Sequence, residues 1–423
     1  MRKFILDTVL CSLFIFGIMG LFSSVTYFKI FELFDPIGDM FADFEMSDLV
    51  MSQLRVAPLA SDDIVVVNIA NANREEIGYM IQILEQYDPA VIGVDVTFAA
   101  PKPYAEDSVF EKTLAMYDNV VIGSELRLPV LEDGKDYGFD TLVTPAEHLS
   151  KHADLAFVNL LTNAANQDDV KFCRELVLRA KVKGIEEEQL AFAVKLAQYK
   201  DPEATQVFLE RGNIIETVNY KGNVMDYGMS EFGTRYFALD IHEVFQESFT
   251  ADLLKDKVVI MCFLGAYIGD KSTRTDLYFT PLNKNYVGKA EPDMFGGVIH
   301  ANTVSMILEE DYIDYMPQST GIALAILTCL IIVFCFKWVY GALPKWYDGI
   351  TKIIQLILVI GISFFMVVLF NLYNYKAELS LVIIVIALSG DSIEVYHGVV
   401  KNLFSKKERS NLFKVNKNFW KES

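Results

Sequence analysis

The sequence lacks the short motifs that identify an enzyme by themselves. It contains no Gly-x-Ser-x-Gly, no His-Glu-x-x-His and no kinase signature. Residues 263–269, "FLGAYIG", lack the Gly-x-x-x-x-Gly-Lys-Ser/Thr spacing of a phosphate-binding loop. There are only five cysteines and no Cys-x-x-Cys pair, which argues against a zinc ribbon or a redox centre. We therefore expect no enzyme activity, no catalytic residue, no metal and no cofactor.

The chain also lacks an excess of positive charge. Its formal net charge is −19, and only the C-terminal tail is basic. Because nucleic-acid binding needs a basic surface, we expect no nucleic-acid partner. The length of 423 residues predicts two or three domains, and a hydrophobic content of 52% is too high for a wholly soluble protein.

Four apolar runs are long enough to cross a membrane, which takes about 20 residues as a helix. They cover residues 8–28, 319–336, 353–373 and 379–396. The first follows Arg2 and Lys3 and could be a signal peptide. It is long for one, and "SSVTYFKIF" offers no good cleavage site, so an uncleaved anchor is the favoured interpretation.

The positive charges beside these runs predict their orientation. Lysines and arginines flank the start of the first run, the loop after the second and the tail, whereas the loop before the fourth run has only Lys376. The pattern predicts both termini in the cytoplasm and residues 30–317 in the periplasm or outside the cell. The predicted domains are an anchor (1–29), an outer domain (30–317), a three-helix membrane region (318–400) and a basic tail (401–423). We expect a multi-pass protein of the bacterial inner membrane.

The first part of the outer domain alternates strands and helices. Strands are predicted at 62–70, 90–98 and 119–126, with helices at 73–87 and 107–117 between them. Asn73 and Glu76 form a capping box at the start of the first helix. Short connections between these elements predict parallel βαβ units.

The second part is less regular. We predict a hairpin around Asp133-Gly134, antiparallel strands at 154–162 and 171–178, and strands at 214–222 and 257–266. Helices are predicted at 186–199 and 237–246. The fold class is therefore α/β with a mixed sheet. Cys173 and Cys262 are interpreted as buried free thiols, with a disulfide as the alternative.

Six segments, in order along the chain, resemble a known family. They are "DDIVVVNIANANREEIG", "PAVIGVDVTFAAPKP", "LAFVNLLTNAANQDDVKFCRELVL", "TVNYKG", "LKDKVVIMCFLGAYIGDKSTRTDLYFTPL" and "FGGVIHANTVSMIL". Together they resemble the type-two CHASE domain over residues 60–317. The resemblance implies a bacterial extracellular sensor, with one span before it and three after it, in proteins that carry a cyclase or kinase output domain and signal as dimers. Asn68 and Ala70 depart from the acidic pair usual in the family.

Polar residues near strand ends are the candidate ligand-binding set. Asp95 and Asp270 follow buried strands, where crevices of α/β sheets lie, and could bind a ligand, perform acid–base chemistry or cap loops. His300 and Asn302 stand two apart at a helix start and should point to opposite faces. Their favoured role is to tie the backbone at a hinge before the second span, with ligand binding as the alternative. Asn68 and Asn159 complete the set.

Three further groups of residues have open interpretations. His148 and His152 in "TPAEHLSKH" could share a metal, but an exposed helix starting at Thr144 and Pro145 is favoured. The tail could lie on anionic lipid or be an ordinary cytoplasmic end. Asp391 and Glu394 share a helix face in the last span. Three interpretations stay open: they lie at the membrane–water interface, they face another helix or a partner, or they couple to an ion.

The leading functional hypothesis is a membrane receptor for an unknown extracytoplasmic ligand. Because the sequence ends soon after Lys401, we expect the signal to leave through a separate cytoplasmic or membrane protein that contacts the tail or the helix face with Asp391 and Glu394. A homodimer is expected by analogy. The alternatives are an anchoring subunit of a membrane complex and an ectoenzyme that uses Asp95, Asp270 or His300.

Overall fold

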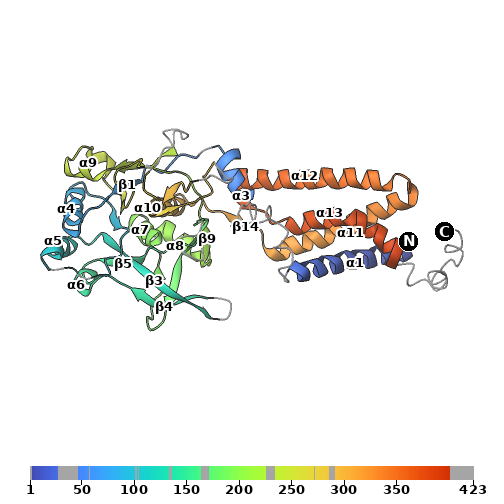
Figure 1. Cartoon of the computed structure of the whole chain (residues 1–423), viewed down its shortest axis with the longest axis horizontal. Helices are drawn as coiled ribbons and strands as arrows, with labels where there is room; N and C mark the ends of the chain where they lie inside the picture. Colours follow the sequence, from blue (N-terminus) through green and yellow to red (C-terminus); the bar gives the residue numbers. More distant parts are fainter. Residues whose placement is uncertain are drawn as a thin grey trace, which may run out of the picture. The chain divides into compact units, whose positions relative to one another are not determined.

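The chain forms two compact units. The computed structural model describes residues 2–26, 46–56, 58–100, 102, 104–132, 136–162, 171–224, 234–270, 272–284 and 291–400. Met46–Ile313 makes up one unit, called here the α/β unit, and Met1–Glu45 together with Asp314–Ser423 makes up the other, called the helical unit (Figure 1). The predicted tail, the hairpin turn at 133–135 and the linker at 163–170 lie outside the described residues.

A parallel sheet forms the centre of the α/β unit. Its strands are β10 (Phe237–Leu239), β1 (Ile64–Asn68), β11 (Val258–Cys262), β2 (Val91–Val94), β3 (Val120–Glu132) and β5 (Asp154–Phe157), in that spatial order. Every neighbouring pair in this row is parallel. The predicted βαβ arrangement is confirmed, since the three strands predicted first are β1, β2 and β3.

Further strands extend the sheet beyond β3 through both antiparallel and parallel pairings. β4 (Asp136–Val143) pairs with the second half of β3, and Glu132 lies opposite Asp136, so the predicted hairpin is confirmed. β7 (Arg179–Val182) pairs parallel with β4, and β8 (Gln189–Leu190) pairs antiparallel with β7. The mixed sheet is therefore confirmed.

The predicted antiparallel pairing of 154–162 with 171–178 is wrong. β5 joins β3 in parallel, while β6 (Glu175–Val177) pairs with β9 (Ile215–Thr217) in a separate ribbon. One isolated bridge, Leu161–Glu175, is the described pairing between the two segments. The physical reason is that β5 buries Ala156 and Phe157 in the sheet, whereas the sequence shows only two apolar runs next to each other.

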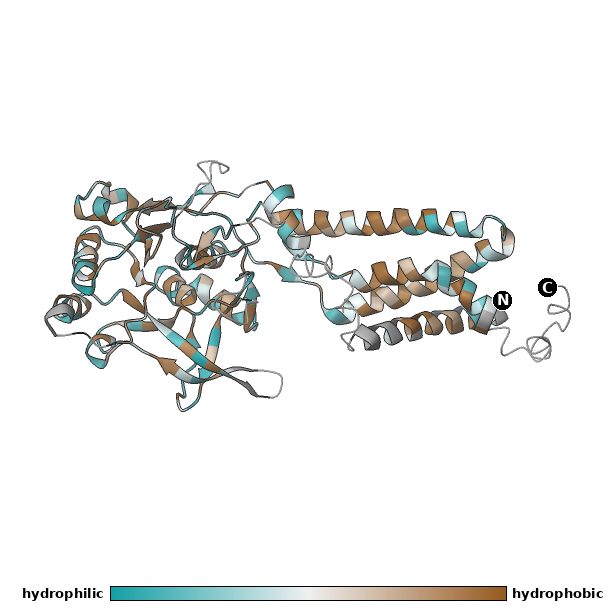
Figure 2. Cartoon of the chain, in the orientation of Figure 1, coloured by the Kyte–Doolittle hydropathy of each residue, from teal (hydrophilic) through white to brown (hydrophobic). Residues whose placement is uncertain are grey.

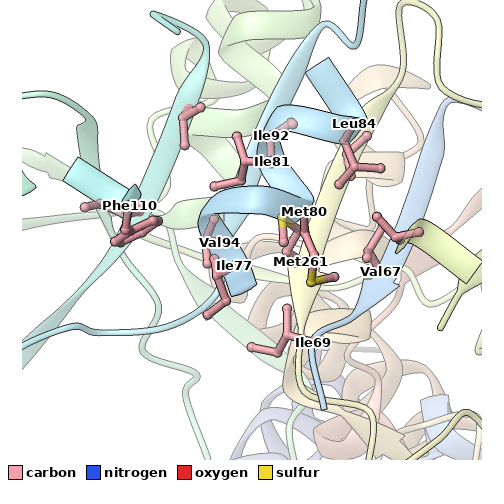
Figure 3. Close-up of a cluster of buried hydrophobic side chains, with 14 of the residues drawn as sticks. Val67, Ile69, Ile77, Met80, Ile81, Leu84, Ile92, Val94, Phe110 and Met261 are labelled. Carbon is pink, nitrogen blue, oxygen red and sulfur yellow. The ribbon is translucent and has the colours of Figure 1, made fainter. Parts of the chain in front are cut away.

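One face of the sheet is covered by α4 (Arg74–Glu85), α5 (Tyr104–Leu114) and α9 (Ile241–Phe245). α4 begins with the predicted capping box of Asn73 and Glu76. Figure 3 shows Ile77, Met80, Ile81 and Leu84 of α4 packed towards side chains of the strands. The strand partners include Val67, Ile92, Val94 and Met261. This continuous apolar contact is the main core of the unit.

The opposite face is covered by α7 (Phe192–Lys200) and α10 (Gly296–Leu308). Gly93 of β2 points to this face because neighbouring strand residues alternate. A Cβ atom at Gly93 would lie 2.6 Å from the Phe192 ring, so α7 packs directly on the strand. α10 is buried from Gly296 to Ile307. α8 (Pro202–Glu210) follows α7 and was missed from the sequence.

Three helix predictions need correction. Phe237–Leu239 is strand β10, and the helix starts only after Asp240, which caps it with Glu243. The helix predicted at 186–199 starts at Phe192, because residues 189–190 pair with β7. In "TPAEHLSKH" only α6 (Glu147–Ser150) is helical, and its N-cap is Ala146, not Thr144. Propensity located these helices, but strand pairing and caps fixed their ends.

Shorter elements complete the α/β unit. They are α3 (Met46–Leu49), the π-helix η1 (Val50–Leu54), the 3₁₀-helix η3 (Ala251–Leu253), and the strands β12 (Leu277–Tyr278) and β13 (Met294–Phe295). β12 and β13 pair antiparallel and lead directly into α10. Cys173 and Cys262 are separate buried thiols, as the favoured interpretation held.

The helical unit contains α1 (Arg2–Thr26), α11 (Gln318–Ala342), α12 (Tyr347–Tyr373) and α13 (Ser380–Val395), which continues into the π-helix η4 (Tyr396–Val400). Among the described helices, α11, α12 and the helical run Ser380–Gly398 are long and apolar enough to cross a membrane. Figure 2 shows α11 and α12 to be hydrophobic over most of their length. The apolar part of α1, Phe4–Gly20, is shorter.

The chain enters α11 through a small β-ribbon. β14 (Asp314–Tyr315) pairs parallel with β15 (Tyr375–Lys376), which lies between α12 and α13. The backbone N–H of Asp314 donates to the carbonyl of Asn374 at 2.9 Å. The start of α11 is thus tied to the connection between the last two helices.

Candidate functional site

A cavity of about 470 Å³ lies in the α/β unit, at the carboxyl ends of its parallel strands. Twelve residues line it: Asp95, Thr97, Glu125, Val158, Asn159, Leu160, Phe263, Thr275, Asp276, Tyr278, Gly296 and His300. They come from the ends of β2, β3, β5 and β11, from the segment that contains β12, and from the first turns of α10. Open α/β sheets bind ligands at this edge.

Asp95 and Asp276 place two carboxyl groups in this cavity. Asp95 follows β2, and its backbone N–H donates to the carbonyl of Met261 at 2.9 Å. Burial and the charge of Asp276 hold the pKa of Asp95 well above its usual range. Burial also raises the pKa of Asp276 to about 6, although hydrogen bonds from Tyr278 and Gly296 and the charge of Lys171 oppose the shift. The two groups therefore compete for ionisation.

Two glycines bring α10 close to these acids. A Cβ atom at Gly296 would lie 3.0 Å from a carboxylate oxygen of Asp276. A Cβ atom at Gly297 would lie 2.3 Å from the Cys262 sulfur and 3.4 Å from Asp95 Oδ2. Any larger residue at Gly297 would push the helix away from β11. "FGG" thus sets the start of α10 against the acid pair.

The carboxylate of Asp95 stands without a partner. Within the part of the chain that the structure describes, it makes no hydrogen bond and no ion pair. A buried charge without a partner is costly, and the cost is lowered when the group keeps its proton or meets a cation.

His300 is a second polar group without a partner in the cavity wall. Its side chain is 1% exposed, and its ring packs edge-to-face on Phe192 with the centroids 5.2 Å apart. Neither ring nitrogen makes a hydrogen bond of acceptable geometry with a described residue. Burial lowers the pKa of His300 to about 4, and the backbone of Val158 opposes this shift only in part. The imidazole is therefore neutral at pH 7 and offers one donor and one acceptor.

The rest of the wall combines held polar groups with apolar ones. Asn159 pairs with the backbone of Leu126, accepting at 2.6 Å and donating at 3.0 Å. Glu125 is held by Arg127 through two contacts, at 2.8 and 3.0 Å. Val158, Leu160 and the Phe263 and Tyr278 rings supply the apolar part. Such a mixture is typical of small-molecule sites.

Three predicted ligand-binding residues thus meet in the cavity: Asp95, Asn159 and His300. The other three lie elsewhere. Asn68 is fully buried, donates to Asp240 at 2.8 Å and to the Gly265 carbonyl, and accepts from the N–H groups of Ala70 and Leu264. It fastens the end of β1 to the loop after β11.

Asp270 and Asn302 have structural contacts as well. Asp270 accepts from the N–H and hydroxyl of Ser272, and these hydrogen bonds hold the pKa of Asp270 below its usual value. Asn302 accepts from the N–H groups of Lys221 and Gly222 at 2.7 and 3.0 Å and donates to two carbonyls. His300 and Asn302 have different surroundings. Asn302 ties backbone together, whereas His300 makes no such bond.

The chain matches the sequence model of a known family. The sequence model of the CHASE2 domain family matches residues 16–335, from within α1 to within α11. The chain belongs to the CHASE2 domain family. CHASE2 domains are sensory extracellular domains, and the apolar helices beside this one indicate a membrane protein. No curated protein matches the chain. No solved structure matches it either.

Sequence reasoning missed two acids of the CHASE2 cavity, Asp276 and Glu125. Asp276 stands in "TRTDLYFTPL", directly before β12, and has a backbone φ of 59°. An aspartate in such a turn, six residues after the chosen Asp270, was a usable signal. No sequence signal marked Glu125 as a cavity residue, because a charged residue inside a predicted strand usually faces solvent.

His148 and His152 of the CHASE2 domain make different contacts. His148 Nε2 lies 3.0 Å from Asp107, which also binds Arg74 at 2.8 Å. The backbone N–H of His152 donates to the Leu149 carbonyl at 3.1 Å. Among the described residues, no group of three or more histidine, cysteine, aspartate or glutamate side chains is placed to hold a metal.

The two membrane acids have different surroundings. Asp391 is exposed on α13 and pairs with Lys352 of α12 at 2.5 Å. Glu394 is exposed one turn further on. A deeper pair was not predicted: Lys337 of α11, with its side chain 3% exposed, lies 2.8 Å from Asp7 of α1. Tyr396 also donates to Asp7 at 3.1 Å, so three helices meet there.

Proposed function

We propose that this chain is a membrane-anchored receptor whose α/β unit lies outside the cytoplasm, with four spans and both termini inside. The distribution of lysine and arginine supports this orientation. The paired Lys337 and Asp7 support α1 as the fourth span, because they join it to α11 at the end that carries the flanking positive charges. We assign the cavity as the ligand site of the receptor.

The observation that carries this proposal is the double role of α10. The first turns of α10 form the cavity wall through Gly296 and His300, and the chain passes from its last residue, Leu308, to the start of α11 at Gln318. A ligand that prefers one position of α10 would therefore act on the segment that enters the membrane.

The segment between α10 and α11 is held at two places. Lys221 Nζ lies 2.5 Å from Glu309 and 2.7 Å from Asp311, which fixes the end of α10 to the α/β unit. β14 then pairs with β15 in the helical unit. A change in α10 would therefore reach both α11 and the connection before α13 along the chain.

A separate protein would carry the signal onward, with the exposed Asp391 and Glu394 or the tail as its contact. The test is to crosslink tagged full-length chain in its native cells and to identify what is captured, beside a version that ends at Lys401. A kinase, cyclase or regulator captured only with residues 402–423 present supports a receptor with a separate output. A second copy of the chain among the products would show the homodimer.

A cavity-filling variant separates sensing from anchoring. Thr97→Phe narrows the cavity, and Glu186→Gln, an exposed change elsewhere, is the control. A receptor should capture its partner in a different amount when Thr97 is replaced, while the control behaves as wild type. Equal capture from all three proteins, with or without the tail, would instead support an anchoring subunit.

The raised pKa values of Asp95 and Asp276 also suit an ectoenzyme, since acid–base catalysts have such groups in cavities. We favour binding because the described residues show no nucleophile activated by His300, whose nitrogens have no hydrogen-bond partner. An ectoenzyme would convert a molecule that it binds, and Asp95→Asn would abolish the conversion without unfolding the chain.

A further inference from the structure

We propose that the cavity binds a small organic cation, a primary ammonium in the simplest case, and places its charge against Asp95 and Asp276. This proposal rests on the receptor function proposed above only in treating the cavity as a ligand site. It names the chemical class of the ligand, which neither the family nor the fold assigns.

The first argument is the charge that the protein leaves unbalanced. Three carboxyl groups line the cavity, and Arg127 balances only that of Glu125, at 2.8 Å. Lys171 lies near Asp276 and over the Tyr278 ring, 5.6 Å from its centroid. No cation of the described chain reaches Asp95. A bound cation would supply the missing partner and allow Asp95 to ionise.

The second argument is independent of charge. His300 is almost completely buried in the cavity wall, and neither of its nitrogens makes a hydrogen bond of acceptable geometry with a described residue, although the Val158 backbone lies near the ring. Native proteins rarely leave such groups unsatisfied, so an unmet group in a cavity indicates a ligand. A neutral imidazole nitrogen accepts a hydrogen bond, and an ammonium has three to donate. Asp95, Asp276 and His300 are thus three side chains that can accept a hydrogen bond.

The third argument concerns the kind of cation. The described residues contain no cluster of histidine, cysteine, aspartate and glutamate with the geometry of a metal site. Phe263, Tyr278, Val158 and Leu160 line the same cavity and would contact an apolar chain. Aromatic rings also attract organic cations. A volume of about 470 Å³ suits a small molecule and excludes a polypeptide domain.

Three probes of the same size test the proposal. The full chain, purified in detergent at pH 8, is mixed with about 10 mM butylammonium, butanol or butyrate at equal ionic strength, and its melting temperature is measured. Butylammonium should raise the melting temperature by about 3 °C, as expected for a ligand near ten times its Kd. Butanol should have a smaller effect, and butyrate none.

The variant Asp95→Asn shows where the cation binds. It keeps the shape of the side chain and removes its charge, so the variant should fold and lose the butylammonium response. Glu186→Gln removes an equal charge from an exposed loop and should keep the response. Equal shifts with butylammonium and butanol, no shift with any probe, or a full response in Asp95→Asn would each overturn the proposal. The capture experiment above would then still decide the receptor function on its own.

Discussion

Asn302 and His300 are neighbours on α10 and are equally buried, yet their side chains differ in every polar contact. Asn302 has five hydrogen bonds to oxygen or nitrogen partners: three to the loop backbone of Lys221 and Gly222, one to the Val298 carbonyl of α10 itself and one to the Tyr236 hydroxyl. His300 makes none of acceptable geometry with the described residues, although the Val158 backbone lies near its ring. The difference separates a residue that holds the fold from one whose hydrogen-bonding capacity remains open for a ligand.

Buried charges show the same contrast between the two units. In the helical unit, Lys337 is paired with Asp7 at 2.8 Å. In the α/β unit, Asp95 has no such partner. Since folding alone would favour a partner or an apolar side chain at both positions, an unpaired acid in a cavity is better explained by binding.

The largest effect is expected from Asn302→Leu. The change leaves the N–H groups of Lys221 and Gly222 and the Tyr236 hydroxyl buried without their acceptor. Each stranded group costs about 1–3 kcal/mol, so the unfolding free energy should fall by about 3–5 kcal/mol. The readout is the urea concentration at which the α/β unit of the full chain becomes sensitive to protease. Gln246→Leu, at an exposed position, is the control, and an equal midpoint for the two variants would show that the Asn302 contacts contribute little.

A smaller effect is expected from Lys337→Met in the helical unit. Removing the lysine takes away the charged partner of Asp7, which should cost about 2 kcal/mol given the partial exposure of Asp7. Trp338 lies beside Lys337 in sequence, so its fluorescence can report thermal unfolding in detergent. The double variant with Asp7→Asn should recover most of the loss. If it does not, the two residues do not act as a pair.

Local sequence signals predicted much of this architecture. The capping box of Asn73 and Glu76, the apolar face of α4 and the long hydrophobic helices depend on residues close in sequence, so periodicity revealed them. The β5 pairing depends on which sheet edge is free, and the segment 237–239 became a strand only because β1 lies beside it. Those outcomes are set by distant residues.

The candidate site was predictable only in part for the same reason. Asn68 ends a buried strand, Asp95 and Asp270 follow buried strands, and the three look alike in the sequence. Asn68 meets Asp240, 172 positions away, whereas no described residue meets the Asp95 carboxylate. Whether a polar residue near a strand end is satisfied depends on such distant contacts, which a single sequence does not display.

Asp95→Asn should change the stability of the folded chain in the opposite direction, because it should stabilise the chain. The pKa of Asp95 in the folded chain lies above the unfolded value near 4. The folded chain therefore holds a proton that the unfolded chain releases, and its stability falls as the pH rises from about 4 through the folded pKa. The variant removes this loss and should be more stable than wild type at pH 8.

The measurement for Asp95→Asn is the protease midpoint in urea at several pH values. Other charged or titratable groups around the cavity shape the same curve, namely Glu125, Arg127, Lys171, Cys262, Asp276, Tyr278 and His300. Because the pKa of Asp276 is about 6, the stability of the variant should still fall between pH 4 and 6, but less than that of wild type. A variant less stable than wild type at pH 8 would mean that the Asp95 carboxylate has a stabilising partner in the protein.

The smallest effect should come from His300→Leu. Replacing a buried polar group that has no partner with an apolar one of similar volume should change stability by less than about 0.5 kcal/mol at pH 8. At lower pH the variant should gain on wild type. The folded pKa of about 4 lies below the unfolded value near 6.5, so wild-type stability is lost as the pH falls from 6.5 to 4. His148→Leu, which breaks a 3.0 Å contact with Asp107, is the matched control and should cost more. A loss above 2 kcal/mol in His300→Leu at pH 8 would show that the imidazole is already bonded within the fold, and the contrast with Asn302 would disappear.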